Sequence, residues 1–201
     1  MGWTSYHAAY YKSNGEVDRK KECDAYFIEG LNRGHFKVLK SSMVGNTYYA
    51  AIKEMVAYEG EDENKNPIYT PIENGEVWAA IFLTSTNNKD YYNFSYKDMD
   101  ETCGPYQCDC PESILKLLSE TKSEYALAWR QRCRDKRKQK NALMRLPIGT
   151  VIEFVRPGTE SKVVAYKHAP EYQFKQPFWM IEGTMNYVPL KHIPKDFVVV
   201  R

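Results

Sequence analysis

The sequence predicts an α+β protein, in which an antiparallel meander sheet covered by helices is followed by a small all-β module. Up to about residue 140, short apolar runs bounded by turn signals alternate with stretches of helical period. From Leu146 onward the pattern changes to period two, with frequent Pro and Gly. We therefore expect an α+β domain over residues 1–140 and a β-barrel-like module over residues 146–201.

Three helices are expected in the first domain. Asp18 suits the N-cap of a helix over residues 18–31, and Pro111 suits the first turn of a short second helix. Thr121-Lys122-Ser123-Glu124 fits a capping box and begins a third helix. Its apolar residues recur at three- and four-residue steps as far as Cys133 and then stop. Residues 134–140 have nothing to bury, so any helix there should project into water.

The strands of the first domain are bounded by turn residues. Gly45-Asn46 is a two-residue loop typical of a hairpin, and Asn74-Gly75 is a second turn. Residues 77–84 are almost entirely apolar, which indicates a central strand covered on both faces. The expected strands are residues 36–44, 47–58, 77–84 and 91–97, with residues 67–71 as a candidate short edge segment.

The C-terminal module should contain short strands punctuated by Pro157-Gly158, Pro170 and Gly183. His192-Ile193-Pro194-Lys195 suits a tight turn before the last of them, an arrangement that would fit an SH3-like barrel. The expected strands are residues 151–155, 163–167, 178–182, 187–190 and 197–200.

The start of the chain has neither a charged segment nor an apolar one of the signal-peptide kind. The longest apolar run, residues 77–83, is too short to cross a bilayer. We therefore expect a cytoplasmic protein that makes no membrane contact. The glycine patterns of nucleotide-binding loops are missing and the four histidines are scattered, so we expect neither a catalytic site nor a cofactor.

The charge is concentrated in one segment, RQRCRDKRKQK, at residues 130–140. Seven cations against Asp135 give this segment a formal charge of +6, whereas the whole chain carries only +2. Such a run suits a polyanion, because each neutralised phosphate releases counterions. The alternative is a solvated helix end whose cations complement the helix dipole. The candidate nucleic-acid-binding residues are Arg130, Arg132, Arg134, Lys136, Arg137, Lys138 and Lys140.

Three cysteines within eight residues, Cys103, Cys108 and Cys110, raise the question of a metal. With Cys133 they number four, but the C-x4-C-x-C spacing lacks the two close pairs typical of zinc sites. We therefore expect no metal and treat them as a loop, with Cys110 packed near Cys133. A redox switch at Cys103 and Cys108 is a third interpretation.

The acids Asp98, Asp100 and Glu101 follow a predicted strand. Grouped carboxylates can bind a divalent cation or perform acid–base work, as in a metal-dependent nuclease. The sequence around them supplies no clear base, nucleophile or phosphate loop. We therefore favour a turn at a strand end with solvated acids.

Two stretches within residues 1–133 form distinctive motifs. The first is Gly2-Trp3-Thr4-Ser5-Tyr6-His7, with Asp18-Arg19-Lys20 shortly after; the second comprises Met99-Asp100-Glu101-Thr102, Gly104-Pro105, Cys110-Pro111, Ile114-Leu115, Leu118, Ala128-Trp129-Arg130 and Cys133. Both resemble a family of uncharacterised proteins from phages and integrative elements of gut bacteria, largely Firmicutes. The resemblance implies no activity. Its setting implies an accessory protein that binds DNA or blocks host defences, including CRISPR nucleases.

Three hypotheses follow for function. The first is a non-enzymatic accessory or counter-defence, anti-CRISPR-like protein of a mobile element, binding nucleic acid or a host nucleoprotein complex through residues 130–140. The second is a protein-interaction module, and the third is the nuclease at Asp98, Asp100 or Glu101. The interaction module would use aromatic side chains such as Trp3, Tyr6, Tyr10, Tyr11 or Trp179, although Trp179 suits the core of the β module better.

Overall fold

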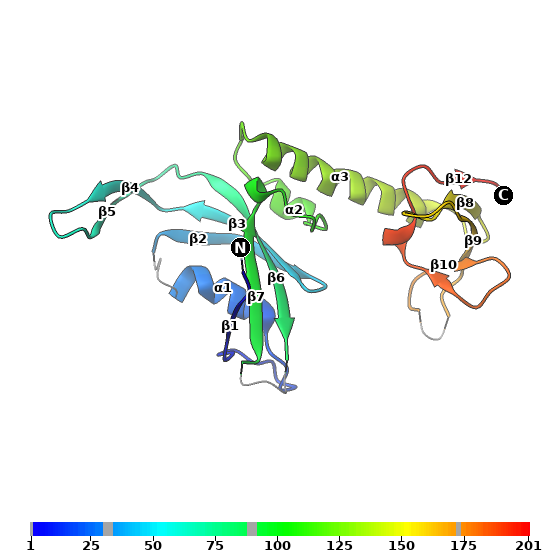
Figure 1. Ribbon diagram of the computed structural model, residues 1–201, viewed down its shortest axis with the longest axis horizontal. Helices are drawn as coiled ribbons and strands as arrows, with labels where there is room; N and C mark the ends of the chain where they lie inside the picture. The colour runs from blue at the N-terminus through cyan, green and yellow to red at the C-terminus, as the bar shows by residue number, and fades with distance from the viewer. Residues whose placement is uncertain (1, 30–33, 88–91, 172–173) are drawn as a thin grey trace. The chain divides into compact units, whose positions relative to one another are not determined.

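The computed structural model describes residues 2–29, 34–87, 92–171 and 174–201 (Figure 1). The chain divides into two compact units, Met1–Arg134 and Asp135–Arg201, here called unit 1 and unit 2. The division falls inside a helix, several residues before the predicted break between residues 140 and 146. Residues 30–31 of the first predicted helix and residue 91 of a predicted strand lie outside the described residues.

Unit 1 is built on an antiparallel sheet with the strand order β1-β7-β6-β3-β2 among the described residues. Gly45 closes the hairpin of β2 and β3, as predicted, with a φ of 59°, a conformation that glycine adopts without strain. The strands are β1 (Thr4–Tyr6), β2 (Phe36–Val44), β3 (Thr47–Glu54), β6 (Val77–Thr86) and β7 (Phe94–Asp100).

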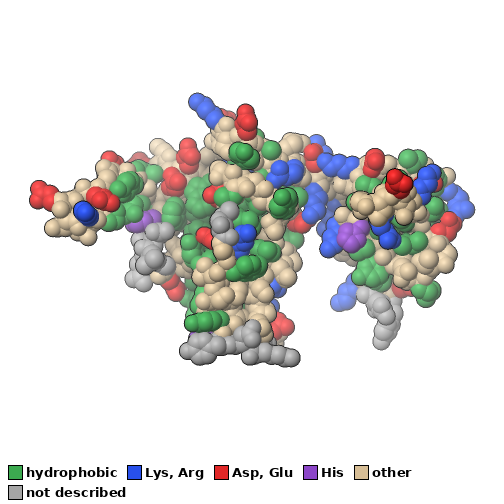
Figure 2. Space-filling model, viewed as in Figure 1, with side chains coloured by type: hydrophobic (Ala, Val, Ile, Leu, Met, Phe, Trp, Pro, Cys, Tyr) green, Lys and Arg blue, Asp and Glu red, His purple; other side chains and the backbone are tan. Residues whose placement is uncertain are grey.

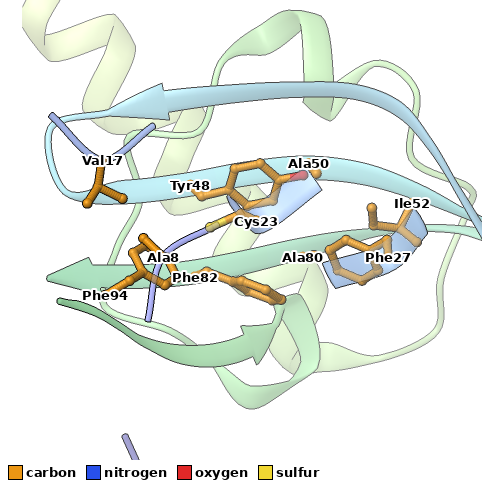
Figure 3. Close-up of a cluster of buried hydrophobic side chains, with 10 residues drawn as sticks. All are labelled: Ala8, Val17, Cys23, Phe27, Tyr48, Ala50, Ile52, Ala80, Phe82 and Phe94. Carbon is orange, nitrogen blue, oxygen red and sulfur yellow. The ribbon is translucent and has the colours of Figure 1, made fainter. Parts of the chain in front are cut away.

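One face of this sheet packs against α1 (Arg19–Glu29). Cys23 and Phe27, four residues apart and so on one side of the helix, are buried among side chains from β3, β6 and β7 (Figure 3). On β3 this face is formed by Tyr48, Ala50 and Ile52, the alternate residues of the strand. Cys23 and Phe27 therefore form the buried side of α1.

The opposite face packs against α2 (Glu112–Leu115) and the first part of α3 (Glu124–Arg145). The intervening residues of the central strands point this way, including Tyr49 on β3 and Ile81 on β6. They contact Ile114, Trp129 and Cys133 in a second apolar cluster. β3 and β6 are thus covered on both faces, which confirms the prediction for residues 77–84.

A separate two-stranded ribbon, β4 (Val56–Glu61) paired with β5 (Pro67–Pro71), extends from the end of β3 (Figure 1). The prediction of one strand over residues 47–58 is wrong, because the chain leaves the main sheet at Met55. A Cβ atom at Gly75 would lie 2.0 Å from the carbonyl oxygen of Glu54, so this crossing of two backbones requires glycine. No Gly or Pro stands between Thr47 and Tyr58, and the sequence pattern therefore does not mark the break.

Unit 2 contains an antiparallel sheet with the strand order β11-β10-β9-β8-β12 among the described residues. The strands are β8 (Val151–Val155), β9 (Lys162–His168), β10 (Phe178–Ile181), β11 (Tyr187–Val188) and β12 (Val198–Val199), with a 3₁₀ helix, η2 (Leu190–His192), before the last. Trp179 is buried in its core, as expected. The described strand pairs leave the sheet open between β11 and β12, so the SH3-like barrel stays a prediction.

The α+β class is confirmed by these elements. The extent of α3 is a correction: instead of losing its apolar side after Cys133, the helix continues to Arg145 and buries Leu143 completely in the core of unit 2. In the described part of the chain, no helix combines the length and apolar character needed to span a membrane.

Candidate functional site

The helix α3 carries the predicted nucleic-acid-binding residues, so its local structure decides what they can do. Its N-terminus is capped by Ser123, whose hydroxyl oxygen accepts a hydrogen bond from the N–H of Ala126 at 3.3 Å. Thr121, the predicted cap, instead accepts from the N–H of Ser123 at 3.1 Å. The helix therefore begins two residues later than predicted, at Glu124, with Ser123 rather than Thr121 as its cap.

Arg130, the first residue of the basic segment, is buried with an exposed fraction of 7%. Its Nε lies 2.5 Å from one carboxylate oxygen of Glu101, and its Nη2 lies 2.8 Å from the other. Nη1 donates to the carbonyl of Ser119 at 2.7 Å. This bidentate pair commits the guanidinium to the interior of unit 1, and Arg130 is corrected from a surface cation to a structural residue.

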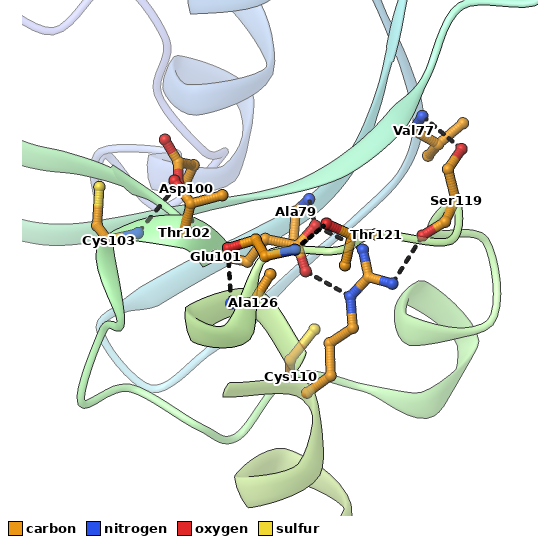
Figure 4. A network of polar contacts seen from close by, with 12 residues as sticks. Val77, Ala79, Asp100, Glu101, Thr102, Cys103, Cys110, Ser119, Thr121 and Ala126 are labelled. Atoms are coloured by element: carbon orange, nitrogen blue, oxygen red, sulfur yellow. Dashed lines mark hydrogen bonds and ion pairs between the residues drawn. The ribbon is translucent and has the colours of Figure 1, made fainter. Parts of the chain in front are cut away.

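Glu101 completes the buried network from the other side (Figure 4). It is 2% exposed and also accepts a hydrogen bond from the backbone N–H of Ala79 on β6 at 3.2 Å. The same network draws in Ser119, whose hydroxyl accepts from the N–H of Val77 at 2.9 Å. Together these bonds join α3 to β6 and to the 3₁₀ helix η1 (Glu101–Cys103) that follows β7.

The predicted acid cluster is thus divided between different roles. Asp100 caps η1 by accepting hydrogen bonds from the N–H groups of Thr102 and Cys103. Glu101 is not a solvated acid as predicted, because its carboxylate is buried against Arg130. A carboxylate with both oxygens occupied by N–H donors is poorly placed to bind a metal ion, so this geometry gives the nuclease hypothesis no support.

The cysteine-containing segment is held by the same part of α3. Trp129 is fully buried and its indole N–H donates to the carbonyl of Gln107 at 2.7 Å. Arg132 donates through Nη2 to the carbonyl of Pro105 at 3.0 Å. The hydroxyl of Tyr49 accepts from the N–H of Asp109 at 3.2 Å. The segment is therefore a loop fixed to the helix and to the sheet.

The four candidate metal ligands differ in burial. Cys110 and Cys133 belong to one apolar cluster, as predicted, whereas Cys108 is partly buried and Cys103 is exposed. Among the described residues, no group of three or more His, Cys, Asp or Glu side chains is arranged to hold a metal ion.

The second half of α3 presents the other predicted cations differently. Arg134, Lys138 and Lys140 are exposed, while Lys136 and Arg137 are partly buried and take part in interactions of their own. Figure 2 shows Lys and Arg side chains gathered along this helix. Arg134 and Lys138 are four residues apart and so lie on one side of the helix. We call the residues Arg134, Arg137, Lys138, Lys140 and Arg145 the cationic face.

Arg145 lies outside the predicted segment, and sequence reasoning missed it. It is exposed in the last turn of α3, seven residues after Lys138 and therefore on the same side. The sequence feature that could have indicated it is the pair of apolar residues Leu143 and Leu146, which follow the basic run and favour a longer helix. In the structure Leu143 packs in the core of unit 2, and Gln139 donates to the carbonyl of Ile193 at 2.5 Å.

Lys167, on β9, is a buried cation that the sequence did not single out. Its ammonium group donates to the carbonyls of Met144 and Leu146 at the C-terminal end of α3, each at 2.5 Å. Burial lowers the pKa of this ammonium group from its usual range. Because the helix end carries partial negative charge, Lys167 is placed to stabilise it.

The aromatic residues named for a protein-interaction surface differ in their exposure and hydrogen bonding. Trp3 and Tyr11 are about half exposed, at 53% and 52%. The hydroxyl of Tyr6 donates to the buried carboxylate of Glu22, and burial raises its pKa. The hydroxyl of Tyr10 donates to Glu29. Trp179 is buried in the core of unit 2, the placement that the sequence favoured, and so is not available as a surface contact.

Comparison with known protein families identifies one match. Residues 120–159 match the model of a family described as Domain of unknown function (DUF6927). This part of the chain includes α3 and β8, and it is less than half of the 201 residues. The match agrees with the predicted resemblance to uncharacterised proteins, and it carries no activity to this chain. No curated protein and no solved structure matches the sequence.

Proposed function

We propose that the protein acts without catalysis, by binding the phosphate backbone of a nucleic acid, free or in a host nucleoprotein complex, through the cationic face of α3. The observation that carries the proposal is the exposure of Arg134, Lys138 and Arg145 on one helix, at spacings that repeat its turn. Lys140 is exposed on the adjacent side, three residues after Arg137. Arg130 is excluded from this surface because its charge is paired with Glu101.

The dimensions of the helix suit this partner. From Arg134 to Arg145 the helix rises about 16 Å, at about 1.5 Å per residue. One strand of duplex DNA carries a phosphate at about every 3.4 Å of axis, so the face would follow about five of them. Contacts of this kind give affinity without sequence preference, because phosphates are common to every sequence.

The biological setting forms part of the same proposal. An accessory or counter-defence role on a phage or other mobile element would use such a surface to occupy nucleic acid or a nucleic-acid-bound host complex. The resemblance of the motifs in residues 1–133 supports this setting. Several of those residues, including Trp129, Arg130 and Cys133, pack together in unit 1 and so would maintain the fold rather than contact the partner.

The test replaces Arg134, Arg137, Lys138 and Lys140 together by Gln and measures binding to a fluorescent 20-base-pair duplex by anisotropy. We expect the affinity at low salt to fall by at least about tenfold, because four phosphate contacts are lost. The matched control replaces Lys37, Lys40, Lys116 and Lys122 by Gln, which changes the net charge equally at exposed positions of unit 1. Equal affinities for the two variants would refute the proposed surface.

A further inference from the structure

Unit 2 contains a cavity of about 490 Å³ that the nucleic-acid proposal does not use. Its apolar lining includes Phe154, Val163, Ile181 and Val188, which all belong to the core cluster of this unit or pack against it. A cavity of this size is within the range of small-ligand sites and is large enough for a bulky side chain.

Two cationic side chains and a histidine line the edge of this apolar surface. Arg156, at the end of β8, and Lys191 and His192, on η2, are exposed and line the cavity. Among the described residues that line it, none is Asp, Glu, Asn, Gln, Ser or Thr. The cavity therefore combines an apolar interior with a rim that attracts negative charge and contains no acid to neutralise it.

The backbone that carries the rim is fixed by its own hydrogen bonds. The N–H of Arg156 donates to the carbonyl of Ser161 at 2.9 Å, and the carbonyl of Arg156 accepts from the N–H and the hydroxyl of Thr159. On the other side, the N–H of His192 donates to the carbonyl of Pro189 at 2.8 Å. The backbone of the rim, held in this way, loses little conformational entropy on binding.

The chemistry of the lining separates two classes of ligand. The lining offers Tyr187 and His192 as polar partners besides the two cations, and the rest is Val, Ile, Phe and Pro. A nucleobase in the cavity would place most of its polar edges against these apolar side chains, and unpaired polar groups are unfavourable when buried. A Leu or aromatic side chain leaves no polar group unsatisfied there. Carboxylates on either side of that side chain would lie where the rim is cationic.

We propose that this cavity binds an acidic peptide segment of a partner protein, with a large apolar side chain inside and flanking carboxylates against Arg156 and Lys191. The site is separate from the cationic face of α3 and does not depend on the nucleic-acid proposal. Through this site the protein would bind a partner protein, in addition to the nucleic acid that the cationic face would bind.

The experiment uses the full chain and a fluorescein-labelled peptide in which one Leu is flanked on each side by two Glu residues. We expect saturable binding that weakens at least about tenfold when the flanking residues are Lys, and by a similar factor when Gly replaces the Leu. Binding that survives replacement of the Leu would show simple charge attraction and overturn the proposal. A peptide that does not bind at millimolar concentration would do the same.

Protein variants locate the site. The double change Arg156→Glu and Lys191→Glu should abolish peptide binding, whereas Lys116→Glu with Lys175→Glu, an equal charge change at exposed positions outside the cavity and the cationic face, should leave most of it. Far-UV circular dichroism of each variant checks that it is folded. Equal losses in the two variants would contradict the assignment, as would competition by a single-stranded oligonucleotide as effective as that by unlabelled peptide.

Discussion

The two halves of α3 carry similar side chains but use them in opposite ways. In the first half, Arg130 is buried and paired with Glu101, and Arg132 is exposed but donates to the carbonyl of Pro105. In the second half, Arg134 and Lys138 are exposed. The difference arises from what packs against each half, since in the first half a buried carboxylate, that of Glu101, lies opposite an arginine. The comparison teaches that the number of cations in a segment does not give the number available to a ligand.

The buried pair and the exposed cations should therefore differ in their contribution to stability. A buried ion pair contributes little relative to an apolar replacement of both partners, because removal of the charges from water is unfavourable. Removal of one partner alone lowers the stability much more, because the other charge is left buried without a partner. An exposed cation remains in water and leaves no buried charge behind when it is replaced. Its substitution should therefore change the free energy of unfolding very little.

The largest expected effect is that of Arg130→Met. Loss of the guanidinium leaves the carboxylate of Glu101 buried without its partner, and the carbonyl of Ser119 loses a donor. We expect the free energy of unfolding of unit 1 to fall by about 3–5 kcal/mol, measured by urea denaturation. The double variant Arg130→Met with Glu101→Leu should recover part of this loss. A single variant as stable as the parent would show that the pair does not hold α3 to the sheet.

A smaller effect is expected for Lys167→Met in unit 2. The substitution keeps the apolar stem but removes the donor to the carbonyls of Met144 and Leu146. It also removes the unfavourable burial of the ammonium group, which offsets part of the loss. We expect the unfolding free energy of unit 2 to decrease by about 1–2 kcal/mol in thermal or urea unfolding. An increase in stability would indicate that burial of this charge outweighs its bonds to the helix end.

Arg134→Met, the matched change in the second half of α3, should alter stability by less than about 0.5 kcal/mol, because the side chain is exposed. The measurement is the same urea denaturation as for Arg130→Met, which makes the two values directly comparable. A loss near that of Arg130→Met would mean that the two halves do not differ as described.

The smallest perturbation is chemical labelling of the native thiols. Cys103 is exposed and Cys108 partly so, whereas Cys110 and Cys133 are buried. Cys23 is also buried, and burial raises the pKa of its thiol, which lowers its reactivity further. Peptide mapping after brief alkylation should find Cys103 labelled first and the three buried cysteines labelled only after unfolding. Early labelling of Cys133 would place the first half of α3 in contact with solvent.

Much of the fold follows from local pattern, and the roles of the charged residues do not. The period-two segments gave the strands of unit 2 closely, because alternation and turn residues are local properties. The burial of Arg130 was missed because it depends on Glu101, which is distant in sequence and is brought opposite by the pairing of β6 with β7. The continuation of α3 was missed for a related reason: Leu143 packs on a module that follows it in the chain.

The salt dependence of nucleic-acid binding tests the central claim most directly. For the parent protein and for the variant with Gln at positions 134, 137, 138 and 140, the binding constant for duplex DNA is measured between 50 and 200 mM salt. If these four cations contact phosphates, the slope of log K against log salt should become shallower by about 3–4, at about 0.9 per phosphate. Parallel lines for the two proteins would contradict the assignment of the cationic face as the binding surface.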